Sequence, residues 1–233
     1  MGRLVGMCVG LLFPSRCCSC GKGNRLLCFL CYREILPLVC QYCPYCPEQS
    51  AFGSTCALCP RSLERLDGLY VGSDFALHSV LQKVIHAMKY HGQPSLASML
   101  ARSSPLDPVL VGQLQESGTI LIPVPLAKDR LRERGYNQAE ELARAYGQQY
   151  GLPVQNLLVR HRSTLPQAKL GRQERLENVR DAFSCAGSLP SSVMLVDDVA
   201  TTLSTLHACA VALRAGGAQT VRGLVLARAR RHG

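Results

Sequence analysis

Eight cysteines near the start of the chain form four pairs with the spacing Cys-x-x-Cys. Two intervening residues make a tight knuckle that turns both thiolates toward one ion, and two knuckles supply the four sulfur ligands of a tetrahedral structural zinc. The spacing therefore predicts two zinc ions, and the simplest grouping places the first two pairs on one ion and the last two on the other. The predicted ligands are Cys17, Cys20, Cys28, Cys31, Cys43, Cys46, Cys56 and Cys59.

Other assignments of these cysteines stay open at the level of sequence. A crossed pairing has the same spacing, and Cys18 can compete with Cys17. Cys40 can likewise compete with Cys46, because Cys40 and Cys43 are also three apart. Residues 43–46 read Cys-Pro-Tyr-Cys, which resembles a redox dithiol, but nothing around them indicates the thioredoxin-like fold that such a motif needs. Structural zinc is the favoured interpretation.

The crowding of the cysteines also indicates the compartment. Eleven of the thirteen lie between Cys8 and Cys59, whereas a secreted disulfide scaffold is usually a short chain stapled throughout. We therefore expect bound metal in a reducing compartment and a cytoplasmic protein.

The apolar residues 4–13 are followed by no Ala-x-Ala-like cleavage site, so we expect a short packed helix there. No stretch reaches about eighteen apolar residues, so we expect no membrane span.

Residues 193–205 have the chemistry to hold a sugar phosphate. An apolar run at 193–196 predicts a buried strand, two aspartates follow it, and a loop of small and hydroxyl residues leads into a helix. Ligands of open α/β sheets bind at the carboxyl ends of strands, and free N–H groups at the start of a helix favour a phosphate. Helix capping is the alternative interpretation, but a cap needs one residue. The predicted binding residues are Asp197, Asp198, Val199, Ala200, Thr201, Thr202, Leu203, Ser204 and Thr205.

The elements that must position these residues fall into two parts. Residues 1–65 are expected to form an N-terminal helix and a cysteine-rich module that metal holds folded, because the segment has little apolar periodicity. Residues 66–233 alternate between strand and helix patterns, which predicts a parallel sheet flanked by helices. Strands are expected at 66–71, 120–124, 154–159, 193–196 and 220–226, and helices at 78–89, 137–150 and 203–215.

The charge of the chain leaves three interpretations of its basic residues. The net charge is +10, and Arg outnumbers Lys by 21 to 5. Arginine suits bidentate phosphate contacts, which would serve either a diphosphate ligand or a nucleic-acid backbone. A solvated basic face is the third explanation. Aromatic residues make up only 6% of the chain and Trp is absent, so an extensive base-stacking platform is not expected.

Several motifs together resemble the ComF family of competence-associated proteins. The acidic loop is similar to the phosphoribosyl diphosphate loop of type I phosphoribosyltransferases. Residues 121–126 read Leu-Ile-Pro-Val-Pro-Leu, residues 134–138 read Arg-Gly-Tyr-Asn-Gln, and residues 160–167 read Arg-His-Arg-Ser-Thr-Leu-Pro-Gln. The cysteine pairs resemble the double zinc ribbon of that family. The likeness extends from about Cys17 to Arg228.

The resemblance implies a type I phosphoribosyltransferase fold for residues 66–233, preceded by the double zinc ribbon. Asp197 and Asp198 would meet the ribose hydroxyls of phosphoribosyl diphosphate, and residues 199–205 would surround its 5-phosphate. Magnesium would bind through the diphosphate, and residues 160–180 would sit where related enzymes have a hood. The implied role is in DNA uptake for natural transformation or in DNA utilisation. Candidate partners are single-stranded DNA and other DNA-uptake proteins.

Two positions depart from the pattern that the resemblance implies. The family loop usually has Gly where this chain has Leu203, and glycine lets the backbone approach a phosphate closely. Purine-salvage phosphoribosyltransferases have an acidic residue at the position of Thr201, so no general base is assigned. Phosphoribosyltransferase activity and a non-catalytic zinc-ribbon accessory role in nucleic-acid handling both stay open.

Overall fold

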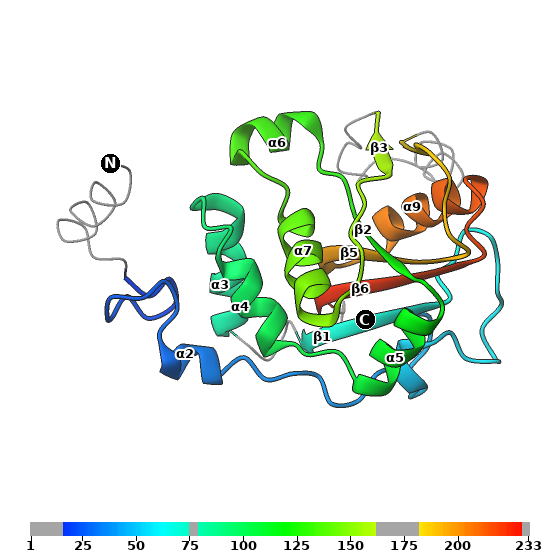
Figure 1. Ribbon diagram of the computed structural model, residues 1–233. Helices are drawn as coiled ribbons and strands as arrows, with labels where there is room; N and C mark the ends of the chain where they lie inside the picture. Colours follow the sequence, from blue (N-terminus) through cyan, green and yellow to red (C-terminus); the bar gives the residue numbers. More distant parts are fainter. Residues whose placement is uncertain (1–15, 75–78, 162–181, 230–233) are drawn as a thin grey trace.

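The structure is a computed structural model that describes residues 16–74, 79–161 and 182–229 (Figure 1). Its centre is a four-stranded parallel sheet with the strand order β1-β6-β5-β2. The strands are β1 (Gly68–Asp74), β2 (Ile120–Pro123), β5 (Ser192–Ala200) and β6 (Thr220–Arg228). A separate antiparallel hairpin pairs β3 (Leu158–Arg160) with β4 (Phe183–Cys185). The expected α/β class with a parallel sheet is confirmed.

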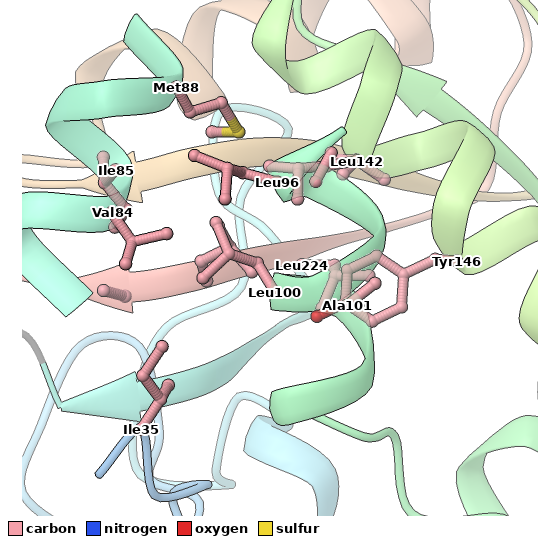
Figure 2. Close-up of a cluster of buried hydrophobic side chains, with 14 of the residues drawn as sticks. Ile35, Val84, Ile85, Met88, Leu96, Leu100, Ala101, Leu142, Tyr146 and Leu224 are labelled. Atoms are coloured by element: carbon pink, nitrogen blue, oxygen red, sulfur yellow. The ribbon is translucent and has the colours of Figure 1, made fainter. Parts of the chain in front are cut away.

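Helices cover both faces of this sheet (Figure 1). One face packs against α3 (Ser79–Tyr90), α4 (Leu96–Ser103), α5 (Pro108–Glu116) and α7 (Gln138–Tyr150), and the other against α9 (Ser204–Ala215) and the β3–β4 hairpin. Shorter helices are α2 (Phe29–Arg33), α6 (Lys128–Arg134) and the 3-10 turn Ala51–Gly53. Figure 2 shows how side chains of α3, α4 and α7 meet Leu224 of β6 in the first of these two cores.

The apolar spacing that predicted a helix at 78–89 is explained by this packing. The spaced residues Val80, Leu81, Val84, Ile85 and Met88 are all buried on α3. The expected strand at 193–196 is also present, but β5 is longer and extends to Ala200. Asp197 and Asp198 therefore lie within the strand, and the expectation that the strand ends before them is wrong.

Four α-helices were not expected from the sequence. α2, α4 and α6 are only five, eight and seven residues long, too short for a clear periodic pattern. α5 is marked by local chemistry, because the Asp107 side chain accepts a hydrogen bond from Val109 N and Pro108 occupies the first turn, which are both helix-start signals.

The cysteine-rich segment covers an edge of the sheet. β1 is an edge strand, and such strands leave backbone groups that would pair with another chain. Here Gln41 Nε2 donates to Val71 O and Gln41 Oε1 accepts from Val71 N, both at 2.9 Å. Leu38 N donates to Gly72 O at 2.7 Å. These contacts fix residues 38–41 against β1. The domain boundary near residue 65 stays a prediction.

Some expectations concern residues outside the described ranges. The apolar run at 4–13 and most of the basic segment that continues from Arg160 to Arg180 lie there. None of the helices in the three described ranges combines the length and apolar character that crossing a bilayer requires.

Candidate functional site

The two aspartates lie where β5 extends beyond its neighbour. β2 ends at Pro123, which pairs with Val196, whereas β5 continues from Asp197 to Ala200 alongside β6. On the β2 side, the space beyond Pro123 is therefore open to side chains and to a ligand. This is the carboxyl end of two adjacent parallel strands, the usual location of ligand sites in open α/β sheets.

A cavity of about 160 Å³ opens at this edge. Besides the two carboxylates, it is lined by three cationic side chains, Lys89 of α3, Arg134 of α6 and Arg160 of β3. Oppositely charged groups from four different elements thus face one space. The remaining lining residues are Val124, Pro125, Leu126, Asn137, Gln138, Ala139 and Thr205.

The two carboxylates in the cavity differ in their partners, because only Asp198 forms an ion pair with Lys89. Lys89 Nζ lies 2.9 Å from Asp198 Oδ2, and the Asp198 side chain is only 10% exposed. Burial and the neighbouring Asp198 charge raise the pKa of Asp197 to about 7, against the opposing effect of the Asp198 N–H, Lys89 and Arg160. Asp197 Oδ1 accepts that N–H at 2.8 Å. Asp197 therefore changes charge near neutral pH.

The motif at 134–138 places hydrogen-bond donors opposite the carboxylates. Gly135 has a φ of 78° and ends α6, and Asn137 caps α7 while its Nδ2 donates to Val124 O at 3.0 Å. Tyr136 OH donates to Met88 O, next to Lys89 on α3. Arg134 Nη1 donates to Gln138 Oε1 at 2.9 Å.

Two donors of this motif are left for a ligand. Arg134 Nε and Gln138 Nε2 are buried and meet no acceptor in hydrogen-bonding geometry among the residues that the structure describes. Buried donors without a partner cost free energy. Both belong to residues that line the cavity, so an anionic or hydroxyl-rich ligand there would supply the missing acceptors.

The hydroxyl loop is divided between two cavities. Thr205, at the start of α9, lines the cavity of the carboxylates. Thr201 and Thr202 instead line a wider cleft of about 430 Å³, whose other walls are residues 44–47 and Arg228. Both threonines are exposed, and Thr202 Oγ1 lies 3.0 Å from Ser204 Oγ. The loop therefore presents hydroxyl groups toward both the acidic pair and the cysteine-rich segment.

Leu203 turns its side chain away from both cavities. It has a φ of 62°, in the left-handed region that favours glycine, and its side chain is buried in the core beneath α9. Leu203 is not among the residues that line either cavity. The leucine at this glycine position thus adopts the glycine conformation and fills the core with its side chain. It leaves the cavity open.

The eight paired cysteines come together as two groups of four. Cys17, Cys20, Cys28 and Cys31 form the first group, and Cys43, Cys46, Cys56 and Cys59 form the second. Within each group all four sulfurs lie within 4.8 Å of one another, so each group could hold one metal ion. The grouping follows the order of the pairs along the chain. Four thiolates in such a cluster are the ligand set of structural zinc.

Backbone N–H groups point at one sulfur of each group. Cys28 N donates to Cys17 Sγ at 3.4 Å, and Cys56 N donates to Cys43 Sγ at 3.5 Å. Burial opposes ionisation of Cys17, but the N–H groups of Cys20, Cys28 and Ser19 outweigh it and lower the pKa to about 6. Metal ligation requires the thiolate, and this environment favours it.

The structure also separates Cys18 and Cys40 from these ligands. Neither belongs to a group of sulfurs close enough to share an ion. Cys40 is exposed.

The site contains residues that the sequence did not single out. No sequence pattern around Lys89 indicated a role at this site, because that role depends on where the end of α3 meets β5. Arg134 and Gln138 lay in a motif quoted for its family resemblance, and neither was among the predicted binding residues. Two other arginines on the helix of Arg134 have acidic partners, since Arg130 pairs with Glu133 at 2.8 Å and Arg132 with Asp129 at 3.7 Å.

The fold and site together define an α/β protein with a parallel sheet and a cavity lined by both acidic and basic side chains, preceded by two cysteine clusters. The chain is 32% identical over 231 residues to competence protein F of Haemophilus influenzae, covering 93% of this chain and 98% of that protein. The chain therefore belongs to the ComF family.

Two further relatives are similar to this chain over most of its length. The chain is 25% identical to competence protein ComFC of Bacillus subtilis over 89% of this chain and 86% of that protein. It is 29% identical to the DNA utilization protein YhgH of Salmonella typhimurium, over 94% and 99% respectively. No family model matches the chain. Among solved structures, the allosteric regulatory enzyme of purine biosynthesis aligns with a TM-score of 0.35 and 19% identity, covering 58% of this chain and 25% of that chain.

The two clusters give a first prediction about metal content. Purified protein should contain about two zinc ions per chain, one for each set of four thiolates. Cys17→Ser and Cys43→Ser should each remove about one ion, whereas the matched variants Cys18→Ser and Cys40→Ser should retain both. Elemental analysis gives the stoichiometry. Less than one zinc per wild-type chain, or a loss of zinc in Cys40→Ser, would contradict this assignment.

The left-handed conformation of Leu203 predicts that glycine will destabilise the protein less than alanine at this position, the reverse of the usual order within a helix. Leu203→Ala loses buried apolar surface and keeps the left-handed strain, for a cost of about 2–4 kcal/mol in the free energy of unfolding. Leu203→Gly loses the same surface but relieves roughly 1 kcal/mol of that strain, so it should be less destabilising than Ala. Leu206 is buried within α9, and there Gly should be worse than Ala. Denaturant unfolding of the four variants compares the two orders, and Gly being the worse substitution at both positions would show that Leu203 is not strained.

The raised pKa of Asp197 predicts a pH-dependent cost. The unfolded carboxyl ionises near pH 4, whereas the folded one ionises near 7, so stability is lost as the pH rises between these values. Asp197→Asn removes the ionisation. Its free energy of unfolding, relative to wild type, should therefore rise from pH 5 to pH 7.5 and then level off. Denaturant unfolding at each pH checks this, with the exposed Asp129→Asn as the control. A constant difference between Asp197→Asn and wild type would show that Asp197 ionises normally.

Proposed function

We propose that the cavity at the end of β5 binds phosphoribosyl diphosphate or a related sugar phosphate, with magnesium carried on the diphosphate. The observation that supports this most strongly is the facing arrangement of Asp197 and Asp198 with Lys89, Arg134 and Arg160 around one space. A ligand that has both hydroxyl groups and phosphate groups matches both sides of such a cavity.

The acidic side suits the ribose. Two carboxylates in adjacent positions of an extended strand can accept hydrogen bonds from two neighbouring sugar hydroxyls. Lys89 Nζ already pairs with Asp198 Oδ2, and the same carboxylate has further lone pairs that can accept from a sugar hydroxyl. Asp197 has a pKa of about 7, and the hydroxyl donors of a ribose would favour its ionised form.

The cationic side suits the phosphates. Arginine offers a planar set of donors that matches phosphate oxygens, and Arg134 Nε is one of the buried donors described above. Thr205 lies in the first turn of α9, where N–H groups and the helix dipole favour an anion. The loop residues 199–204 are proposed to complete the phosphate contacts through their backbone, since the side chains of Thr201 and Thr202 line the neighbouring cleft and that of Leu203 is buried in the core.

We propose binding without assigning a catalytic base. Apart from the aspartate pair, the described residues that line the cavity include no His, Glu, Cys or Tyr. A transferase could still act by positioning its reactants and by stabilising charge.

We further propose that this site serves DNA uptake or DNA utilisation. The printed names of the relatives support this process, and the net charge of +10 is compatible with a nucleic-acid partner. Single-stranded DNA and other DNA-uptake proteins are the proposed partner classes. Binding to DNA should weaken steeply with salt, because phosphate contacts release counterions.

The proposed ligand gives a thermal prediction. Phosphoribosyl diphosphate with magnesium, at about a hundred times its Kd, should raise the melting temperature by roughly 5–10 °C, because it binds only the folded state. The double variant Asp197→Asn with Asp198→Asn should fold and lose this rise. Differential scanning fluorimetry measures the shift.

The matched control for that experiment removes a carboxylate outside the cavity. Asp129 lies on α6, is highly exposed and pairs only with a neighbouring arginine on its own helix, so Asp129→Asn should keep the full rise. A wild-type protein that the ligand leaves unshifted would rule out the proposal, and so would a double variant that shifts as wild type does.

A further inference from the structure

A second polar cavity lies at the opposite end of the sheet from the aspartates. It has a volume of about 330 Å³ and lies between the end of α5 and the amino ends of β5 and β6. Its polar lining includes Gln113, Ser117, Ser192, Thr220 and Arg222. No acidic side chain of the described residues lines it, so its character is that of an anion site.

Arg222 occupies a position in β6 where the fold otherwise places apolar residues. Leu224 and Leu226, two and four residues further along, point from the same side of the strand into the core under α3, α4 and α7. Alternation along a strand places Arg222 on that side too. A cationic side chain at such a position is costly unless a partner compensates it.

The carboxylate of Asp67, which could balance the charge of Arg222, is already hydrogen-bonded to other groups. Asp67 Oδ2 accepts from Arg214 Nη2 at 2.7 Å and from Val221 N at 2.8 Å. Arg222 Nη1 is buried and has no hydrogen-bond acceptor in the described part of the chain. Burial lowers the pKa of Arg222, and the charge of Asp67 only partly opposes this effect.

Two hydroxyl groups of the same cavity are already engaged with each other through Thr119. Ser117 Oγ donates to Gln113 O at 2.8 Å, and it lies 2.8 Å from Thr119 Oγ1, which lies 2.7 Å from Ser192 Oγ. Since the Ser117 proton is used, Thr119 donates to Ser117 and Ser192 donates to Thr119. The Arg222 guanidinium is therefore the group of this cavity that offers a charged N–H donor, which suits a tetrahedral oxyanion.

We propose that this cavity binds a phosphate group through Arg222, at a site separate from the one at the end of β5. A phosphate would supply the acceptor that Arg222 Nη1 lacks and the negative charge that the cavity lacks. The phosphate could be inorganic or the end group of a small phosphate ester, and the two sources share the same recognition chemistry.

The test is calorimetric titration of inorganic phosphate and of glycerol 2-phosphate into wild type and Arg222→Gln. Loss of a charged hydrogen-bond donor should weaken phosphate binding about tenfold or more. Arg102 on α4 is exposed and does not line the cavity, so Arg102→Gln should bind as wild type does. Binding of inorganic phosphate alone identifies the free ion as the ligand, whereas binding of both probes identifies the phosphate end group.

Two further measurements keep the outcome decisive. Phosphoribosyl diphosphate should still raise the melting temperature of Arg222→Gln, so failure of one site is distinguishable from failure of the other. In wild-type protein, phosphate should also shift the NMR resonance of the Arg222 Nε–H group, which requires no variant. Equal phosphate binding by wild type and Arg222→Gln, or an Arg222 resonance that phosphate does not move, would overturn the proposal.

Discussion

The candidate site depends on holding two adjacent carboxylates at the edge of a buried sheet. Like charges placed so close together oppose each other's ionisation, and burial adds to the cost. The fold compensates Asp198 directly with Lys89 of α3 and leaves Asp197 with a raised pKa. The overhang of β5 beyond β2 creates the space in which this occurs. A ligand with hydroxyl donors and anionic groups would donate hydrogen bonds to the two carboxylates and balance the charge of the cationic side chains that face them.

The second cysteine group is structurally connected to the same region. Tyr45, within its first knuckle, stacks on His207 of α9 with ring centroids 5.7 Å apart, and its hydroxyl lies 3.2 Å from His207 Nε2. Arg228 Nη2 donates to Pro44 O at 2.7 Å. These contacts join the knuckle to the start of α9 and to the end of β6, on either side of the hydroxyl loop. A metal ion in this group would thus stabilise one wall of the cleft that Thr201 and Thr202 line.

Sequence reasoning was most reliable where a pattern was local. Cys-x-x-Cys spacing identified the residues that form the two sulfur groups, because a knuckle is made within four residues. The apolar periodicity of α3 and the buried run of β5 also depend on near neighbours. The ends of helices and strands were harder to predict from the sequence. β5 extends to Ala200 because β6 continues beside it as far as Arg228, and that pairing joins residues far apart in the chain.

The site residues that sequence reasoning missed are those brought in by tertiary structure. Lys89 lies more than a hundred positions before its partner Asp198, and only the packing of α3 against the sheet joins them. The side chain of Leu203 was in doubt for the same reason, since its direction depends on a backbone conformation that the sequence does not reveal. Arg222 has no motif, and its unusual position is apparent only from the side of β6 that it shares with Leu224.

The most direct test of the account is a carbon-13 NMR titration of the Asp197 side-chain carboxyl, with and without phosphoribosyl diphosphate and magnesium. We predict that the Asp197 carboxyl titrates with a midpoint near pH 7 in the free protein and with a lower midpoint when the ligand is bound. A midpoint near the ordinary value of about 4, unmoved by the ligand, would contradict it.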